Sequence, residues 1–122
     1  MENITFENNK DGAGLFIAHV LKAFEESTVF IEASVICPVM FAVQWFTLSK
    51  PENGTIIWSD NPAIYSTVQK AVKSLISMVS CKSGPIVVTN LKITSDRITI
   101  SFMSGTLFNE VIIMKSYMIE GE

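Results

Sequence analysis

The side chains best suited to chemistry are few in this chain and stand far apart in the sequence. His19 is the only histidine, and it falls within a stretch of helical apolar spacing. A general base needs a partner that orients it and a nucleophile or water beside it. The spacing around His19 indicates neither, so we interpret it as a structural residue of a helix.

Gly12-Ala13-Gly14 comes shortly before the same helical stretch. A glycine-rich loop that opens a helix can bind an anion through its free backbone amides. The phosphate-loop form also requires a terminal Gly-Lys-Ser/Thr, and the dinucleotide form requires a third glycine at fixed spacing. Neither is present, so we predict a plain flexible loop, with Asp11 as the cap of the helix that follows.

No catalytic, cofactor-binding or metal-binding residues are predicted. Structural zinc would need more ligands than one histidine and two cysteines provide. Cys37 and Cys81 are interpreted as reduced cysteines packed like small apolar residues, which favours a cytoplasmic protein. The pairing of either thiol with His19 as a nucleophile is a competing reading that no spacing supports.

Composition and charge exclude several kinds of partner. Of the 122 residues 48% are hydrophobic and 17% are charged, and the net charge is -3. The basic residues are scattered, which disfavours nucleic-acid binding. Residues 28–48 carry a single charge, Glu32, and are long enough to cross a bilayer. Pro38 and the many β-branched residues argue against a membrane span, so none is expected.

Apolar periodicity predicts the elements of the N-terminal half. Residues 4–6 alternate as a short strand, and residues 15–26 have the spacing of an amphipathic helix. Two strands are predicted over residues 28–37 and 39–48, and a turn rich in Pro, Asn and Gly leads into a further strand over residues 55–58.

The strand over residues 39–48 is apolar on both of its faces. One face carries Val39, Phe41, Val43 and Trp45, and the other carries Met40, Ala42, Phe46 and Leu48 together with Gln44. A strand of this kind is normally central, with something packed on each side. We therefore expect either that helices cover both faces or that a partner covers one.

The C-terminal half is predicted as a helix followed by strands. Polar caps and then Pro62 at a first helical position predict an amphipathic helix of about five turns that ends before Gly84-Pro85. Strands are predicted over residues 86–94 and 97–103, joined by a tight turn. Residues 111–119 favour a final strand, although periodicity leaves a helix open there.

The predicted order is β-α-β-β-β-α-β-β-β. Meandering strands joined by tight turns indicate a mainly antiparallel sheet with two helices packed on it. The sequence thus predicts an α+β fold, organised as a single domain over residues 1–122.

The scarcity of chemical groupings and the low charge content together favour a small protein-binding module over an enzyme. Within that class we expect an inhibitor or immunity-type protein that covers a partner's active site, by analogy with small acidic proteins of that kind. The alternatives are a homo-oligomeric structural or scaffold domain, which buries apolar surface against its own copy, and a small-ligand-binding protein or enzyme.

Four residues are candidates for contact with a protein partner. Trp45 and Trp58 fall on the two arms of one predicted hairpin and are natural anchors where exposed, although a core position competes for both. Glu25 and Glu26 form the only adjacent acidic pair. They fall at a helix end, where a solvated face is the usual explanation.

Overall fold

Antiparallel pairing joins every strand that this computed structural model describes into one sheet. The structure describes residues 3–27, 29–30, 39–50, 55–59, 62–79 and 84–117. Along the chain these form β1 (Ile4–Phe6), α1 (Lys10–Glu26), β2 (Val39–Lys50), β3 (Thr55–Ser59), β4 (Ala63–Tyr65), α2 (Val68–Lys73), α3 (Leu75–Val79), β5 (Ile86–Ile93), β6 (Arg97–Ser104) and β7 (Leu107–Tyr117).

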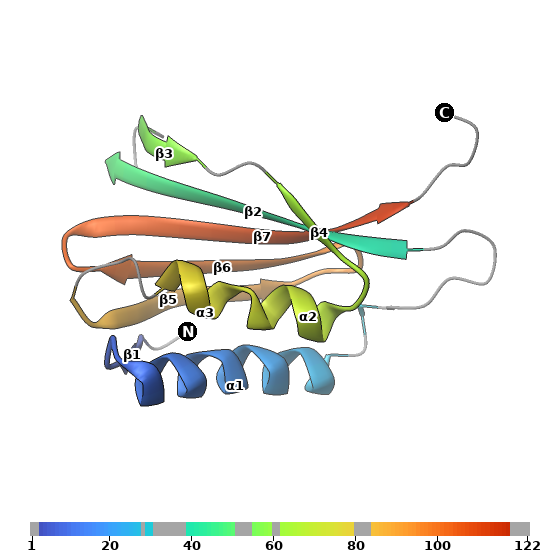
Figure 1. Cartoon of the computed structure of the whole chain (residues 1–122), viewed down its shortest axis with the longest axis horizontal. Helices are drawn as coiled ribbons and strands as arrows, with labels where there is room; N and C mark the ends of the chain where they lie inside the picture. Colours follow the sequence, from blue (N-terminus) through green and yellow to red (C-terminus); the bar gives the residue numbers. More distant parts are fainter. Residues whose placement is uncertain are drawn as a thin grey trace.

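The sheet has the order β1-β5-β6-β7-β2-β3, and β4 pairs with β2 beside that path. β5, β6 and β7 form a meander in which each strand pairs with the next. β2 comes from the other half of the chain and lies along β7, from Val39 opposite Tyr117 to Leu48 opposite Phe108. The result is the predicted α+β fold with a mainly antiparallel sheet (Figure 1).

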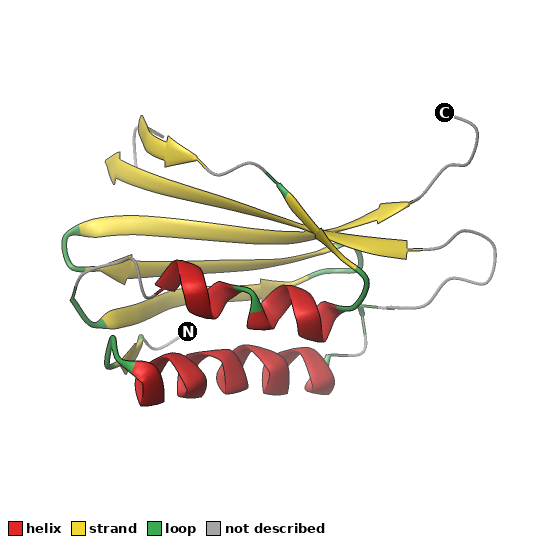
Figure 2. Cartoon of the chain, in the orientation of Figure 1, coloured by secondary structure: helices red, strands yellow, loops and turns green. Residues whose placement is uncertain are grey.

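The helices lie on one side of the sheet, where they build the core with its inner face (Figure 2). Phe16 of α1 packs on Phe102 of β6 with ring centroids 5.6 Å apart. The same core cluster includes the fully buried side chains of Val20, Val68, Val72, Leu75, Val79, Ile98 and Ile100. Burial of each such large apolar side chain contributes about 1.5–3 kcal/mol, which makes this layer the main source of stability.

The start of α1 differs from its prediction. The helix begins at Lys10 rather than at residue 15, and its cap is Asn9 rather than Asp11. The Asn9 side-chain oxygen accepts a hydrogen bond from the backbone N–H of Gly12 at 2.8 Å. Gly12 is buried, and a Cβ at this position would overlap the carbonyl oxygen of Glu7. The glycine pattern predicts a loop here, but Gly12 is instead required for close backbone packing inside a helix.

The predicted helix after Pro62 begins later and is divided. Residues 63–65 form β4, with Tyr65 opposite Phe41 of β2. α2 follows Thr67, whose hydroxyl oxygen accepts a hydrogen bond from the backbone N–H of Lys70 at 3.1 Å. Ser74 separates α2 from α3, and its hydroxyl donates to the carbonyl oxygen of Ala71 at 2.6 Å. A serine hydroxyl that bonds back to the preceding turn commonly bends a helix in this way.

Two further predictions concern the strand over residues 28–37 and the final segment of the chain. Of the strand predicted over residues 28–37, the structure describes only Val29 and Phe30, which lie outside any helix or strand, and the other residues lie outside the described ranges. The final segment, for which the sequence leaves a strand and a helix open, is the strand β7.

Where Gly105 turns the chain between β6 and β7, its φ is 62°. No described helix combines the length and apolarity needed to cross a membrane.

Candidate functional site

Strand alternation gives the sheet two faces with different surroundings. On β6, Ile98, Ile100 and Phe102 are fully buried against the helices. Of the residues that alternate with them, Thr99 and Met103 are partly exposed and Ser101 is buried. Because neighbouring residues of a strand point to opposite faces, the same division continues on the strands paired with β6. The side away from the described helices is called the open face below.

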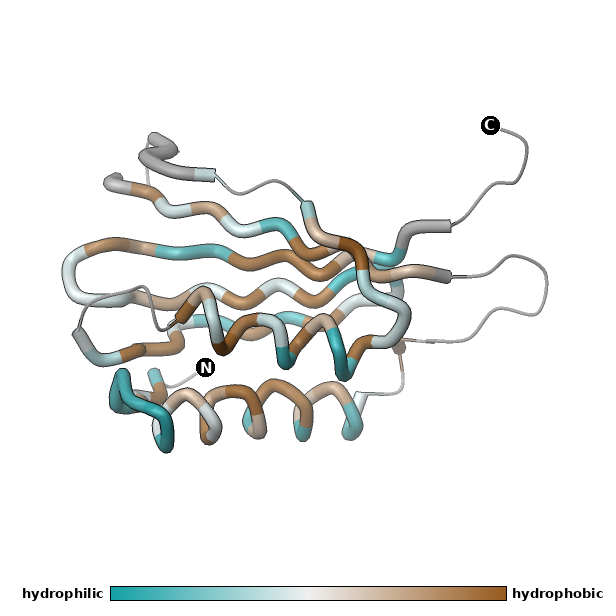
Figure 3. The backbone as a smooth tube through the Cα atoms, in the orientation of Figure 1, coloured by the Kyte–Doolittle hydropathy of each residue, from teal (hydrophilic) through white to brown (hydrophobic). Residues whose placement is uncertain are grey.

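Pairing registers identify the residues of the open face. On β2, β7 and β6 its exposed or partly exposed members are Met40, Ala42, Gln44, Phe46, Phe108, Glu110, Ile112, Met114, Arg97, Thr99 and Met103. Ile64 of β4 stands opposite Ala42 and is 53% exposed. Most of these side chains are apolar, and Figure 3 shows apolar residues along β7 and β2 as well as along the helices.

Two opposite charges lie on the open face of β7 and β6. Glu110 is on β7, opposite Phe46 of β2 and Ser101 of β6. Arg97 opens β6 and stands opposite Met114. On β7 and β6 the face therefore combines apolar side chains with one acidic and one basic side chain at different positions along the strands.

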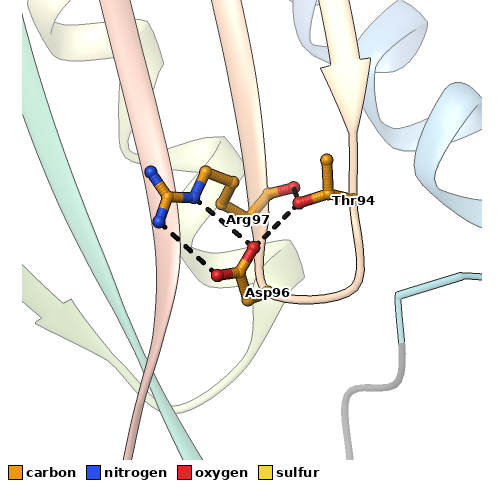
Figure 4. A network of polar contacts seen from close by, with 3 residues as sticks. All are labelled: Thr94, Asp96 and Arg97. Carbon is orange, nitrogen blue, oxygen red and sulfur yellow. Dashed lines mark hydrogen bonds and ion pairs between the residues drawn. The ribbon is translucent and has the colours of Figure 1, made fainter.

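The basic end of the open face is ordered by a turn between β5 and β6 (Figure 4). Asp96 accepts hydrogen bonds from the Thr94 hydroxyl at 2.8 Å and from Nε of Arg97 at 3.4 Å. These two bonds, with that from Thr94 the stronger influence, lower the pKa of Asp96 below its ordinary value. Because both charged side chains are largely exposed, this pair orients Arg97 and adds little stability.

Trp45 lies on the inner face and not on the surface. Its side chain is 1% exposed, and its Nε1 donates to the side-chain oxygen of Asn109 at 3.2 Å. The Thr47 hydroxyl donates to the same oxygen at 2.8 Å, and Asn109 itself donates to the carbonyl oxygen of Leu107. Trp45 therefore takes the core position that competes with a contact role, and it does not meet the condition of exposure on which its role as an anchor depends.

The structure places two of the other three candidate contact residues away from the open face. The backbone of Trp58 pairs with Thr47, so the two tryptophans are not directly opposite one another, and the Trp58 side chain lies outside what the structure describes. Glu25 and Glu26 are exposed in the last turn of α1, in the helix layer. Their role in binding a partner stays a prediction.

His19 has no catalytic setting among the described side chains. Its Nε2 is buried without a hydrogen-bond partner, and its ring lies 5.9 Å from that of Phe6. Cys37 and Cys81 lie outside the described residues. Within the described ranges, no three His, Cys, Asp or Glu side chains stand close enough together to hold a metal ion.

The open-face residues of β7 and β6 were not identified from the sequence. Ile112 and Met114 fall in a run whose period fits both a strand and a helix, so the sequence alone assigns them to no face. The sequence signal that points to this face is that of β2, which is apolar on both faces while the sequence predicts two helices to cover them. Comparison with known protein families, curated proteins and solved structures found no match to this chain.

Proposed function

We propose that this chain is a small protein-binding module whose contact surface is the open face. The observation that carries the proposal is the partly exposed apolar surface of β2, β7 and β6 on the side that the described helices leave uncovered. Large apolar patches rimmed by polar groups are typical of protein contact sites. Ile112 and Phe46, near the middle of this surface, supply the apolar area that such contacts bury.

The inhibitor or immunity-type role is the more specific form of this proposal. It is supported by the small size and acidic balance of the chain, with 122 residues and a net charge of -3. A rigid sheet face with Glu110 among apolar side chains suits a partner that presents a basic group beside an apolar one. The reduced state proposed for Cys37 and Cys81 favours a cytoplasmic setting.

A capture experiment with three baits tests the contact surface. The baits are the wild-type chain, Ile112→Lys on the open face and Ile76→Lys on α3, where Ile76 is 43% exposed. A charge in the middle of an apolar contact is expected to remove partner binding, because the ammonium would have to lose its water. The Ile76→Lys bait is expected to retain the same partner, since its change lies in the helix layer.

The outcome depends on which bait loses the partner. Circular dichroism first establishes that both variants keep the wild-type secondary structure. Loss of the partner with Ile112→Lys alone supports the open face as the contact surface. Loss with Ile76→Lys alone would place the contact in the helix layer, and the absence of any bound protein, including further copies of the chain, would contradict the proposed function.

A further inference from the structure

The open face is self-complementary, and we propose that the partner it binds is a second copy of this chain. The inference rests on the proposed function and names the occupant of the same surface. Two copies pack open face to open face, as the two sheets of a sandwich do at a separation of about 10 Å. A two-fold axis relates them, so that each copy contributes the same surface.

Strand pairing orders the open face into rows that cross the strands. Read from β2 through β7 to β6, three successive rows consist of Ala42, Met114 and Arg97; then Gln44, Ile112 and Thr99; then Phe46, Glu110 and Ser101. We call these the arginine row, the central row and the glutamate row. Successive rows are two residues, or about 7 Å, apart along the strands.

A two-fold axis along the central row exchanges the arginine row with the glutamate row. The ring of Phe46 in each copy then lies over the small side chain of Ala42 in the other, so a large group meets a small one. Ile112 packs on its own copy at the centre, and the Gln44 amides face each other. Close packing of this kind is what a protein interface needs at its core.

The positions of Glu110 and Arg97 favour an axis along the central row over an axis along β7. With the axis along the central row, Glu110 of one copy lies over Met114 of the other, one strand or about 4.8 Å from Arg97. The symmetry produces this opposite-charge pair twice. An axis along β7 would instead place each Glu110 on its own copy, which is repulsive. Lys92 of β5 extends the central row and therefore lies over its own copy, but it stands at the rim, where its exposed ammonium stays in water.

The size of the surface indicates the class of interface to which the dimer belongs. The open face is five strands wide, at a spacing of about 4.8 Å, and six residue steps of about 3.4 Å long. Its projected area is therefore roughly 400 Å² for each copy. Standard interfaces bury about 800 Å² for each partner, so this contact belongs to the weak, reversible class. A dissociation constant on the order of 10–100 μM is therefore expected.

Sedimentation velocity with charge exchange tests the proposal. The wild-type chain is expected to change from monomer to dimer between about 5 μM and about 500 μM. Glu110→Arg and Arg97→Glu are each expected to weaken dimerisation about tenfold or more, because each places like charges together twice. An equimolar mixture of the two variants is expected to recover the dimer, since both pairs in a mixed dimer are again of opposite sign.

Lys22→Glu on α1 is the matched control, because it reverses an exposed charge in the helix layer and is expected to leave dimerisation unchanged. A wild-type chain that remains monomeric at about 500 μM overturns the self-association. Single variants that dissociate without recovery in the mixture overturn the proposed axis. If the chain stays monomeric while Ile112→Lys abolishes capture of a different protein, the proposed function stands and the dimer does not.

Discussion

Gly12 and Gly14 lie two positions apart in the first turns of α1, and replacing each with alanine is expected to change stability in opposite directions. Gly14 is exposed, and a Cβ there meets nothing within 4 Å. Gly14→Ala is therefore expected to stabilise the chain by about 0.5–1 kcal/mol through helix propensity alone. The same gain applies at Gly12, where it is opposed by overlap of the new Cβ with the backbone of Glu7.

The cost at Gly12 exceeds the gain because backbone cannot move aside as a flexible side chain can. Overpacking costs about 1–3 kcal/mol. Displacement of the helix start also weakens the cap from Asn9, which is worth about 1 kcal/mol. The net expectation for Gly12→Ala is a loss of about 1–3 kcal/mol, or a fall in Tm of about 4 °C for each kcal/mol.

Urea unfolding of the wild-type chain and both variants, followed by circular dichroism, measures the two changes. Equal slopes of the transitions keep the comparison one of native-state stability. A Gly12→Ala variant as stable as the wild type would refute the account of the α1 start, because the close approach of Glu7 would then not constrain position 12. A clear loss of stability in Gly14→Ala would refute the open surroundings assigned to that position.

Further changes probe the buried network, the helix dipole and the turn. Asn109→Leu is expected to cost about 2–4 kcal/mol in urea unfolding, because two buried donors lose the acceptor that they share. Glu26→Gln, in the last turn of α1, is expected to raise the free energy of unfolding by about 0.3–1 kcal/mol at low salt, and Asp11→Asn in the first turn to lower it by a similar amount; equal signs would contradict the dipole explanation. Asp96 is ionised more readily in the folded chain than in the unfolded one, so its contribution to stability is present at neutral pH and lost as the pH falls below 3.8. Asp96→Asn is accordingly expected to be less stable than the wild type at pH 7, and thermal unfolding is expected to show this difference shrinking as the pH falls below 3.8. A difference that stays constant in acid would show that the carboxylate charge is not the cause.

Local patterns in the sequence were sufficient to predict most of the elements, because each depends on residues close together in the chain. The alternation of Ile98, Ile100 and Phe102 places one face of β6 in the core, as expected. The antiparallel turn that includes Asp96 follows from turn chemistry that needs no distant partner. The long apolar period after Thr67 likewise identifies the second helical region, although not its interruption at Ser74.

Long-range contacts decided what the sequence left open. β4 has three residues and exists through its pairing with β2, so Pro62 read alone as a helix start was misleading. The alignment of β2 with β7 brings together segments more than 60 residues apart, and it places Trp45 and Asn109 in one buried network. Whether an apolar strand face meets a helix or water depends on these placements, and for that reason the open face could be recognised only in the tertiary structure.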